Sequence, residues 1–410
     1  SMTSLREALS LKWEGHSPES KLVYLKLVHQ QLKSGEIVAG LVELAKSINV
    51  NKKTLSNAIT DLKSKKLIST QKVNGKGINS GKKRVGFELL PLNIDSIFPD
   101  ESLIAKLVES TLIVTKDRRT NSALLLLIII ITAKANEFGV VTDLPKSTIK
   151  QLAGITDSRL KSQLSKLMDM GVFRSVVSGL SGKYAFGKTC SYYFIDLNHK
   201  LIGINKNYQI MQLNALSYQN FLAGKIFLTY RKLKWRPETY KDIITIEGYP
   251  FEVDPDTQVF FKDKQAIIFA RYFQTRIDEL ASTMLTRISK PNLEVMSITT
   301  DMVDKMFFPK HLQYKHKVNA KCIVHLTNLI QRLIIFYAEY VGEILNFAYK
   351  ERNLQMRHMI IPTPLDTDAT YLKVISISNN NEDDSIRRFT ALTFDKLTMQ
   401  LKFVEQPEHT

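Results

Sequence analysis

The chain of 410 residues carries 57 Lys and Arg against 40 Asp and Glu, which gives a formal net charge of +17. An apolar content of 44% with only 17 Gly and 12 Pro excludes collagen-like and low-complexity chains and indicates two or three folded domains. The two cysteines, Cys190 and Cys322, are too few for a disulfide framework and are typical of reduced thiols in a cytosolic protein.

Most of the basic excess lies in the first half of the chain. Lys and Arg gathered in one region favour a polyanionic partner for that region. Lysines that merely keep a surface soluble explain the charge equally well, so the charge alone leaves both interpretations open.

The first patterned region predicts two helices joined by a tight turn. An amphipathic helix is expected over Val38–Ile48, and it ends at Asn49, which tolerates the left-handed backbone of such a turn. Asn51 is placed to cap the next helix. That helix has one apolar stripe with the spacing i, i+4 and i+7, formed by Leu55, Ile59 and Leu62. The apolar period then changes to about two in KLISTQKV and RVGFELLPL, which predicts a β-hairpin with a tip rich in Gly and Lys.

The longest apolar run, ALLLLIIIITA, covers Ala123–Ala133. A membrane-spanning helix needs roughly 20 apolar residues, so this run predicts a fully buried helix instead. The first residues of the chain mix both signs of charge, which does not fit a signal peptide. We therefore expect a cytoplasmic, nucleoid-associated protein without a membrane partner.

A second copy of the helix pair follows when Glu43–Ser69 is placed over Thr148–Arg174 without a gap. The copy predicts a helix over Ser147–Ala153, a turn at Gly154 and a cap at Thr156. The inner stripe of its second helix consists of Leu160, Leu164 and Leu167. A second hairpin is expected from VFRSVVS and CSYYFIDL, with GLSGKYAFGKT between them.

The expected order of elements is helix, turn, helix and hairpin. With this order, the segment LAKSINVNKKTLSNAITDLKSKKLI resembles the winged helix-turn-helix domains of bacterial regulators of the MarR and GntR type. The resemblance covers about residues 20–92 and, less closely, about residues 118–198. It implies tandem winged helix-turn-helix domains at 1–95 and 96–200. Together with the helical patterns of the second half, described below, the expected fold is mainly α with small β-hairpins, of the α+β class, with an α-rich C-terminal domain at 201–410. In a winged helix-turn-helix domain the second helix of the motif enters the DNA major groove and the hairpin, or wing, lies beside it.

In the first copy, the polar face of the second helix and the hairpin are expected to contact DNA. Asn pairs well with adenine, and Lys pairs with guanine or phosphate. The candidate residues are Lys52, Lys53, Ser56, Asn57, Thr60, Lys63, Lys72, Lys76, Lys82, Lys83 and Arg84.

The second copy carries a weaker form of the same pattern. Asp157, at the start of its second helix, would oppose a phosphate, so a protein-facing role competes with DNA contact here. The candidate residues are Ser158, Arg159, Lys161, Ser162, Ser165, Lys166, Lys183 and Lys188.

In the second half of the chain the expected elements are mostly helices, at Ala215–Trp235, Lys264–Ser289 and Ala320–Arg352. The last is apolar around much of its circumference, which predicts burial in a core or in a homodimer interface. A hairpin with the turn DPDT is expected between the first two, and the strands TYLKVISIS and RRFTALTFD are expected to pair.

Three features of the sequence bear on enzyme activity. Asp254 with Asp256, and Asp366 with Asp368, form paired carboxylates, but both pairs lie in turns that favour Asp. The residues His311, His316, Cys322 and His325 match no zinc spacing that we know. Neither a phosphate-binding loop nor a recombinase series occurs in the sequence. We expect no enzyme activity, no cofactor and no metal site.

The expected function is therefore sequence-specific binding of double-stranded DNA by a homodimer, with a further protein partner as an option. A bacterial, phage or mobile-element transcriptional regulator or repressor is the first candidate. A plasmid-type DNA replication initiator that binds repeated origin sites is the alternative, and a nucleic-acid enzyme with an unrecognised site in residues 200–410 is the third.

Overall fold

The structure is a computed structural model. The residues that it describes are 3–73, 84–113, 121–183, 185–204, 208–214, 243–246, 249–252, 266–288, 300–316, 319–349, 356–362, 371–378, 391–395 and 400–404. The chain divides into two compact units, the first formed by Ser1–Arg174 with Tyr193–Lys206 and the second by Ser175–Tyr192 with Asn207–Thr410. Most of the two expected N-terminal domains therefore packs as one unit, whereas residues 175–192 belong to the other.

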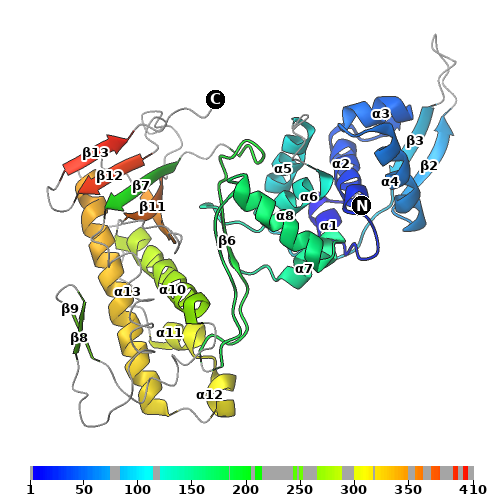
Figure 1. Ribbon diagram of the computed structural model, residues 1–410. Coiled ribbons are helices and arrows are strands. Elements are labelled where there is room, and N and C mark those ends of the chain that lie inside the picture. Colours follow the sequence, from blue (N-terminus) through cyan, green and yellow to red (C-terminus); the bar gives the residue numbers. More distant parts are fainter. Residues whose placement is uncertain are drawn as a thin grey trace. The chain divides into compact units, whose positions relative to one another are not determined.

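The first unit begins with a short helix and continues with a six-element group that we call the first repeat (Figure 1). The short helix is α1 (Leu5–Ser10). The first repeat consists of α2 (Pro18–Ser34), β1 (Ile37–Ala39), α3 (Leu41–Ser47), α4 (Lys52–Ser64), β2 (Ile68–Val73) and β3 (Arg84–Leu89). Its three strands form an antiparallel sheet in the order β1-β3-β2.

The helix expected over Val38–Ile48 begins later in the structure than the sequence predicts. Val38 lies in β1, opposite Gly86 of β3, and the helix begins only after Gly40, its N-cap residue. The β-branched residues Ile37 and Val38 favour a strand, and β3 provides the partner that a local pattern does not reveal. The prediction was therefore wrong for Val38–Gly40, and the remainder of the predicted helix corresponds to α3.

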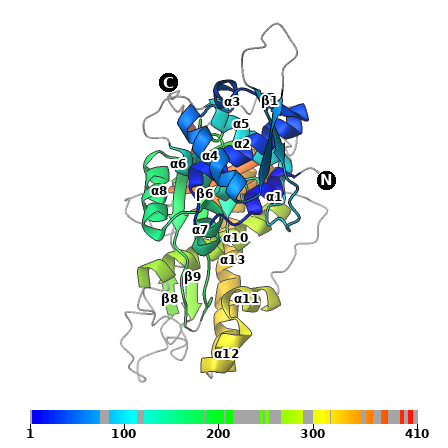
Figure 2. The same cartoon turned by 90° about the vertical axis from the view of Figure 1, so that its right-hand side faces the viewer.

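The turn and the second helix follow the predicted local chemistry. Asn49 has φ 50°, and the Asn51 side chain accepts a hydrogen bond of 2.7 Å from the Thr54 backbone N–H. Leu55 and Leu62 are fully buried, because α4 packs against α2 (Figure 2). The cap and the apolar stripe together determine which side of α4 remains on the surface.

A separate helix and a second group of six elements, the second repeat, follow in the chain. The separate helix is α5 (Glu101–Ile113). The second repeat consists of α6 (Ser122–Thr132), β4 (Val140–Val141), α7 (Lys146–Ala153), α8 (Asp157–Asp169), β5 (Phe173–Val177) and β6 (Tyr192–Ile195). Its sheet has the order β4-β6-β5, so both repeats share the same succession of elements and the same strand order.

The helix α6 is the expected buried helix. It packs against α2, α5, α7 and α8, and Leu124, Leu127 and Ile130 are fully buried. The apolar run therefore forms the shared core of the two repeats. Among the described residues, none of the helices is both long enough and apolar enough to cross a membrane.

Two lysines are buried in the core of the first repeat. The Lys21 ammonium donates hydrogen bonds to the carbonyl oxygens of Leu9, at 2.8 Å, and Leu11, at 2.5 Å, and Lys26 donates to that of Ile48, at 3.0 Å. Leu11 and Ile48 are the C-cap residues of α1 and α3. The lysines therefore satisfy carbonyl groups at helix ends, where a positive charge is favoured.

The second unit combines long helices with a five-stranded sheet (Figure 1). Within the described residues of this unit, the long helices are α10 (Ala266–Ile288) and α13 (Ala320–Tyr349), and the short ones are α11 (Thr300–Phe307) and α12 (Lys310–His316). The sheet has the order β10-β11-β7-β12-β13 and is built from β7 (Tyr208–Asn214), β10 (Met356–Ile361), β11 (Tyr371–Ser378), β12 (Ala391–Asp395) and β13 (Gln400–Val404). The fold is thus mixed α+β, with more strand in this half than the sequence led us to expect.

One predicted pairing in this half was wrong. The strands of TYLKVISIS and RRFTALTFD do not pair with each other, because β7 lies between β11 and β12. Within the segment expected to form a hairpin, β8 (Ile243–Ile246) pairs with β9 (Tyr249–Glu252), whereas the expected turn DPDT lies outside the described residues. The aspartate pairs and the expected helix Ala215–Trp235 lie outside the described residues.

The long helix α13 is buried within a single copy of the chain. Its apolar residues pack against α10, and Ile334, Tyr337, Val341, Ile344 and Leu345 are all almost inaccessible to solvent. On the same helix, Ile335 is 41% exposed and Phe336 is half-buried. Most of the apolar surface behind that prediction is therefore covered in the monomer.

Candidate nucleic-acid interface

The surface of α4 is divided into an apolar inner side and a polar outer side. Leu55, Ala58 and Leu62 are at most 2% exposed. The outer side, which we call the α4 basic face, is exposed throughout and consists of Lys52, Lys53, Ser56, Asn57, Thr60 and Lys63. All six α4 residues expected from the sequence therefore lie on one accessible face, with no acidic residue in the first turn of the helix.

The acidic residue of α4, Asp61, is held away from this face. Its Oδ1 lies 2.5 Å from Nδ1 of His16, and its Oδ2 accepts a hydrogen bond of 2.5 Å from the Ser20 hydroxyl. Beside it, the Lys65 ammonium lies 4.7 Å from the ring centroid of the buried Trp13. These contacts attach the C-terminal half of α4 to the first turn of α2 and to the segment that precedes it. Sequence reasoning missed them, because the partners lie more than 40 residues apart.

The hairpin of the first repeat extends the basic surface. Lys72 in β2 and Arg84 in β3 are exposed, and Val73 is paired with Arg84 in the ladder. Both residues therefore lie at the end of the β2–β3 ladder next to the segment that connects the two strands. The predicted tip residues Lys76, Lys82 and Lys83 lie outside the described residues.

The corresponding helix of the second repeat is α8, and some of its polar residues contact other protein groups. Five candidate residues are exposed, namely Ser158, Lys161, Ser162, Ser165 and Lys166. Arg159 was expected on the same face, but it is half-buried and its guanidinium donates to Glu19 of α2 at 3.0 Å. The first turn also presents Asp157, which pairs with Lys150 of α7 at 2.8 Å. The N-terminal turn of α8 is therefore engaged with protein groups.

The expected second hairpin is not an independent hairpin. Between β5 and β6, an isolated bridge joins Ser181 to Lys188, and the chain between these residues belongs to the second unit. Lys183 and Lys188 are exposed there, but Phe186 is only 5% exposed. The sequence pattern revealed the strands without showing what the segment between them contacts.

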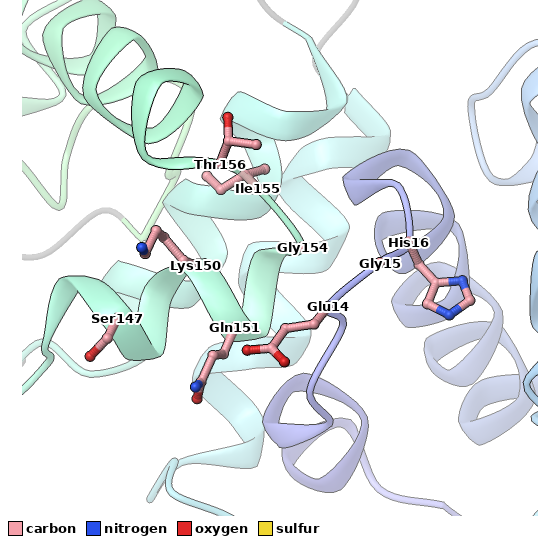
Figure 3. Close-up of a pocket in the computed structure, with 9 residues that line it drawn as sticks. All are labelled: Glu14, Gly15, His16, Ser147, Lys150, Gln151, Gly154, Ile155 and Thr156. Carbon is pink, nitrogen blue, oxygen red and sulfur yellow. The ribbon is translucent and has the colours of Figure 1, made fainter.

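A pocket of about 450 Å³ lies between the loop before α2 and the second repeat (Figure 3). It is lined by the loop Glu14–His16, by α7 and by the turn at Gly154. Gly154 has φ 67°, and a Cβ there would come within 2.5 Å of the carbonyl oxygens of both Trp13 and His16. Figure 3 shows the His16 ring directed away from the other labelled side chains. Its Nδ1 contacts Asp61 instead. The turn of the second repeat thus packs closely against the N-terminal loop.

The residues considered for a metal site lie in α12 and α13. Among the described residues, no group of three or more His, Cys, Asp or Glu side chains could hold a metal ion. His311 lies in α12 and is exposed, whereas Cys322 lies in α13 and is buried.

Comparisons of the chain with protein-family models, with curated proteins and with solved structures find no match.

Proposed function

We propose that the chain binds double-stranded DNA in a sequence-specific manner, with α4 in the major groove. The observation that carries this proposal is the α4 basic face, which is fully exposed and presents Lys52, Lys53, Asn57 and Lys63 without an accompanying carboxylate. The succession of helix, strand, two helices and a hairpin in each repeat supports the assignment to winged helix-turn-helix domains.

The proposed contacts fall into two classes. Asn57 and Lys53 are suited to base edges, since Asn can pair with adenine N6 and N7 and Lys with guanine O6 and N7. Lys72 and Arg84 at the hairpin are suited to phosphates, which position the protein on the duplex without reading sequence. The remaining residues of the face, Ser56, Thr60 and Lys63, can serve either class.

The biological role that we propose first is a transcriptional regulator of a bacterium, phage or mobile element. The second candidate is a replication initiator of the plasmid type. The observation that favours it is the packing of two repeats of identical topology in one unit. A footprint on genomic DNA separates the two, because a regulator should protect one promoter site and an initiator an array of direct repeats.

The DNA-binding proposal is tested by fluorescence anisotropy with a duplex selected from a random pool. Each phosphate contact adds close to one unit to the slope of log affinity against log salt concentration, so we expect a slope of magnitude above about two. Lys53→Glu should weaken binding by about tenfold or more. Lys106→Glu is the matched control, because Lys106 is exposed on α5 outside the proposed interface. No binding by the wild-type chain, or equal losses in both variants, contradicts the proposal.

A further inference from the structure

The two repeats differ at the positions where a helix-turn-helix domain would meet DNA. The α4 helix begins with two exposed lysines, Lys52 and Lys53. The α8 helix begins with Asp157, whose side chain is 82% exposed, and its first cation, Arg159, is bound to Glu19. A phosphate approaching the start of α8 would therefore meet a carboxylate and a guanidinium that is already paired.

The segment Ser175–Tyr192, which connects β5 to β6, is built around a buried aromatic residue. The Phe186 ring centroid lies 5.0 Å from that of Phe307, 5.1 Å from that of Tyr272 and 5.4 Å from that of Phe269. These distances are typical of aromatic pairs in a core, and the partners lie in α10 and α11. The tip of the second hairpin is thus part of the core of the second unit.

The backbone of the segment is also held by the second unit. Phe186 has φ 63°, a conformation that side-chain-bearing residues rarely adopt, and its N–H donates to the Phe307 carbonyl at 2.7 Å. The adjacent Gly187 faces Leu312 and His311 of α12. A strained residue persists only where its surroundings determine it, so this geometry indicates a specific docked state.

Both ends of the segment contact α10. The Arg271 guanidinium donates to the Ser175 hydroxyl at 3.0 Å. At the other end, the Tyr192 hydroxyl donates to the Glu279 carboxylate, and Arg276 lies 5.4 Å from the Tyr192 ring centroid. The segment is therefore fixed along its length and not only at its tip.

We propose that Ser175–Tyr192 is a docking segment, which lies within the second repeat in the sequence but is built into the core of the second unit and does not serve as a DNA-binding wing. It follows that only the first repeat contacts DNA, a step that rests on the proposed function. The docking segment occupies the place in the chain that the basic hairpin occupies in the first repeat. Withdrawing it to contact DNA would expose Phe186 and the rings around it to water, which is unfavourable for apolar surface.

The docking is tested by hydrogen exchange on the full-length chain. Phe186→Ala should raise the exchange rates of residues 178–191 and of α11 by about tenfold or more and leave those of α4 unchanged. Phe186→Leu, which keeps an apolar side chain, should give a smaller change in the same places, and it serves as the second variant if the alanine variant does not fold. Lys188→Ala is the control, because Lys188 is an exposed side chain of the same segment. Unchanged exchange in α11 for both Phe186 variants overturns the docking.

The assignment of DNA contact to the first repeat is tested by anisotropy on the same selected duplex. The double variant Lys161→Glu with Lys166→Glu, on the exposed side of α8, should change the dissociation constant by less than about twofold, whereas Lys53→Glu should raise it by about tenfold. Comparable losses in the two variants overturn the assignment. If the wild-type chain binds no DNA at all, the proposed function fails, and the exchange measurement still decides the docking.

Discussion

Nδ1 of His16 lies 2.5 Å from Oδ1 of Asp61, and this contact joins the loop before α2 to the helix that we propose reads DNA. The other carboxylate oxygen accepts a hydrogen bond from Ser20, so Asp61 has a partner on both sides. The same loop contacts the second repeat, because the Trp13 backbone N–H donates to the Gln151 carbonyl at 2.7 Å. Residues 13–20 thus set the position of α4 relative to the rest of the first unit.

The Asp61 contacts predict a loss of specificity on mutation. Asp61→Ala leaves His16 and Ser20 without their partner, which should lower the free energy of unfolding by roughly 1–3 kcal/mol. A less firmly held α4 should weaken binding to the selected duplex more than binding to random DNA. Thermal unfolding and anisotropy with both duplexes measure these effects. Asp169→Ala, at the exposed end of α8, is the control, and an unchanged ratio of the two affinities would refute the positioning role.

Asn57 is expected to carry base preference. Asn57→Ala should cost roughly 1–3 kcal/mol on the selected duplex and relax the preference at a single base pair. Arg84→Ala should instead weaken all sequences alike, because its proposed contact is with phosphate. Selection from a random pool with each variant gives the comparison. Equal losses on selected and random DNA for Asn57→Ala would count against its proposed role.

The buried Lys26 makes stability depend on pH in the alkaline range. Burial lowers the pKa of its ammonium group from 10.5 to about 8, so between these values the unfolded chain binds more protons than the folded one. Stability from this group therefore rises as the pH increases from 8 to 10.5, by about 3 kcal/mol at most. Lys26→Met should remove this part of the slope in urea unfolding, whereas the surface variant Lys106→Met should retain it. A slope identical to that of the wild type in Lys26→Met would show that the burial argument is wrong.

The buried Asp278 of α10 makes stability change with pH in the opposite direction. Burial raises the pKa of its carboxyl from 3.8 to about 8, against the hydrogen bond that Gln274 donates to it at 2.7 Å. Between these values the folded chain binds more protons than the unfolded one, so stability falls as the pH rises from about 4 to 8. Asp278→Asn keeps a hydrogen-bonding side chain that cannot ionise. Its melting temperature relative to the wild type should increase steadily over this range, and a constant difference would contradict the assignment.

The predicted homodimer now depends on little exposed apolar surface. On α13, Val324 and Ile335 are 58% and 41% exposed and lie about three helical turns apart on one side of the helix. If they form a dimer contact, Val324→Glu with Ile335→Glu should convert a dimeric chain into a monomer in light scattering at tens of micromolar. A monomeric wild-type chain under the same conditions would rule out the dimer.

The sequence by itself determined the local features of the first unit. Asn49, Asn51 and the stripe from Leu55 to Leu62 act within a few residues of one another, so their spacing alone predicts the turn, the cap and the exposed side of α4. The buried helix at Ala123–Ala133 and the repeat of the helix pair are local patterns of the same kind. The exposed DNA-contact candidates of α4 could be named for this reason.

The tertiary structure decided everything that depends on distant partners. β7 separates β11 from β12, Asp61 is bound by His16 and Ser20, and Arg159 is bound by Glu19. The burial of Phe186 likewise depends on distant partners, because the rings that surround it lie in α10 and α11, about a hundred residues further along the chain. Apolar and charged side chains have no directional preference for a particular distant partner, so the sequence pattern shows that they will be buried or paired but not with what.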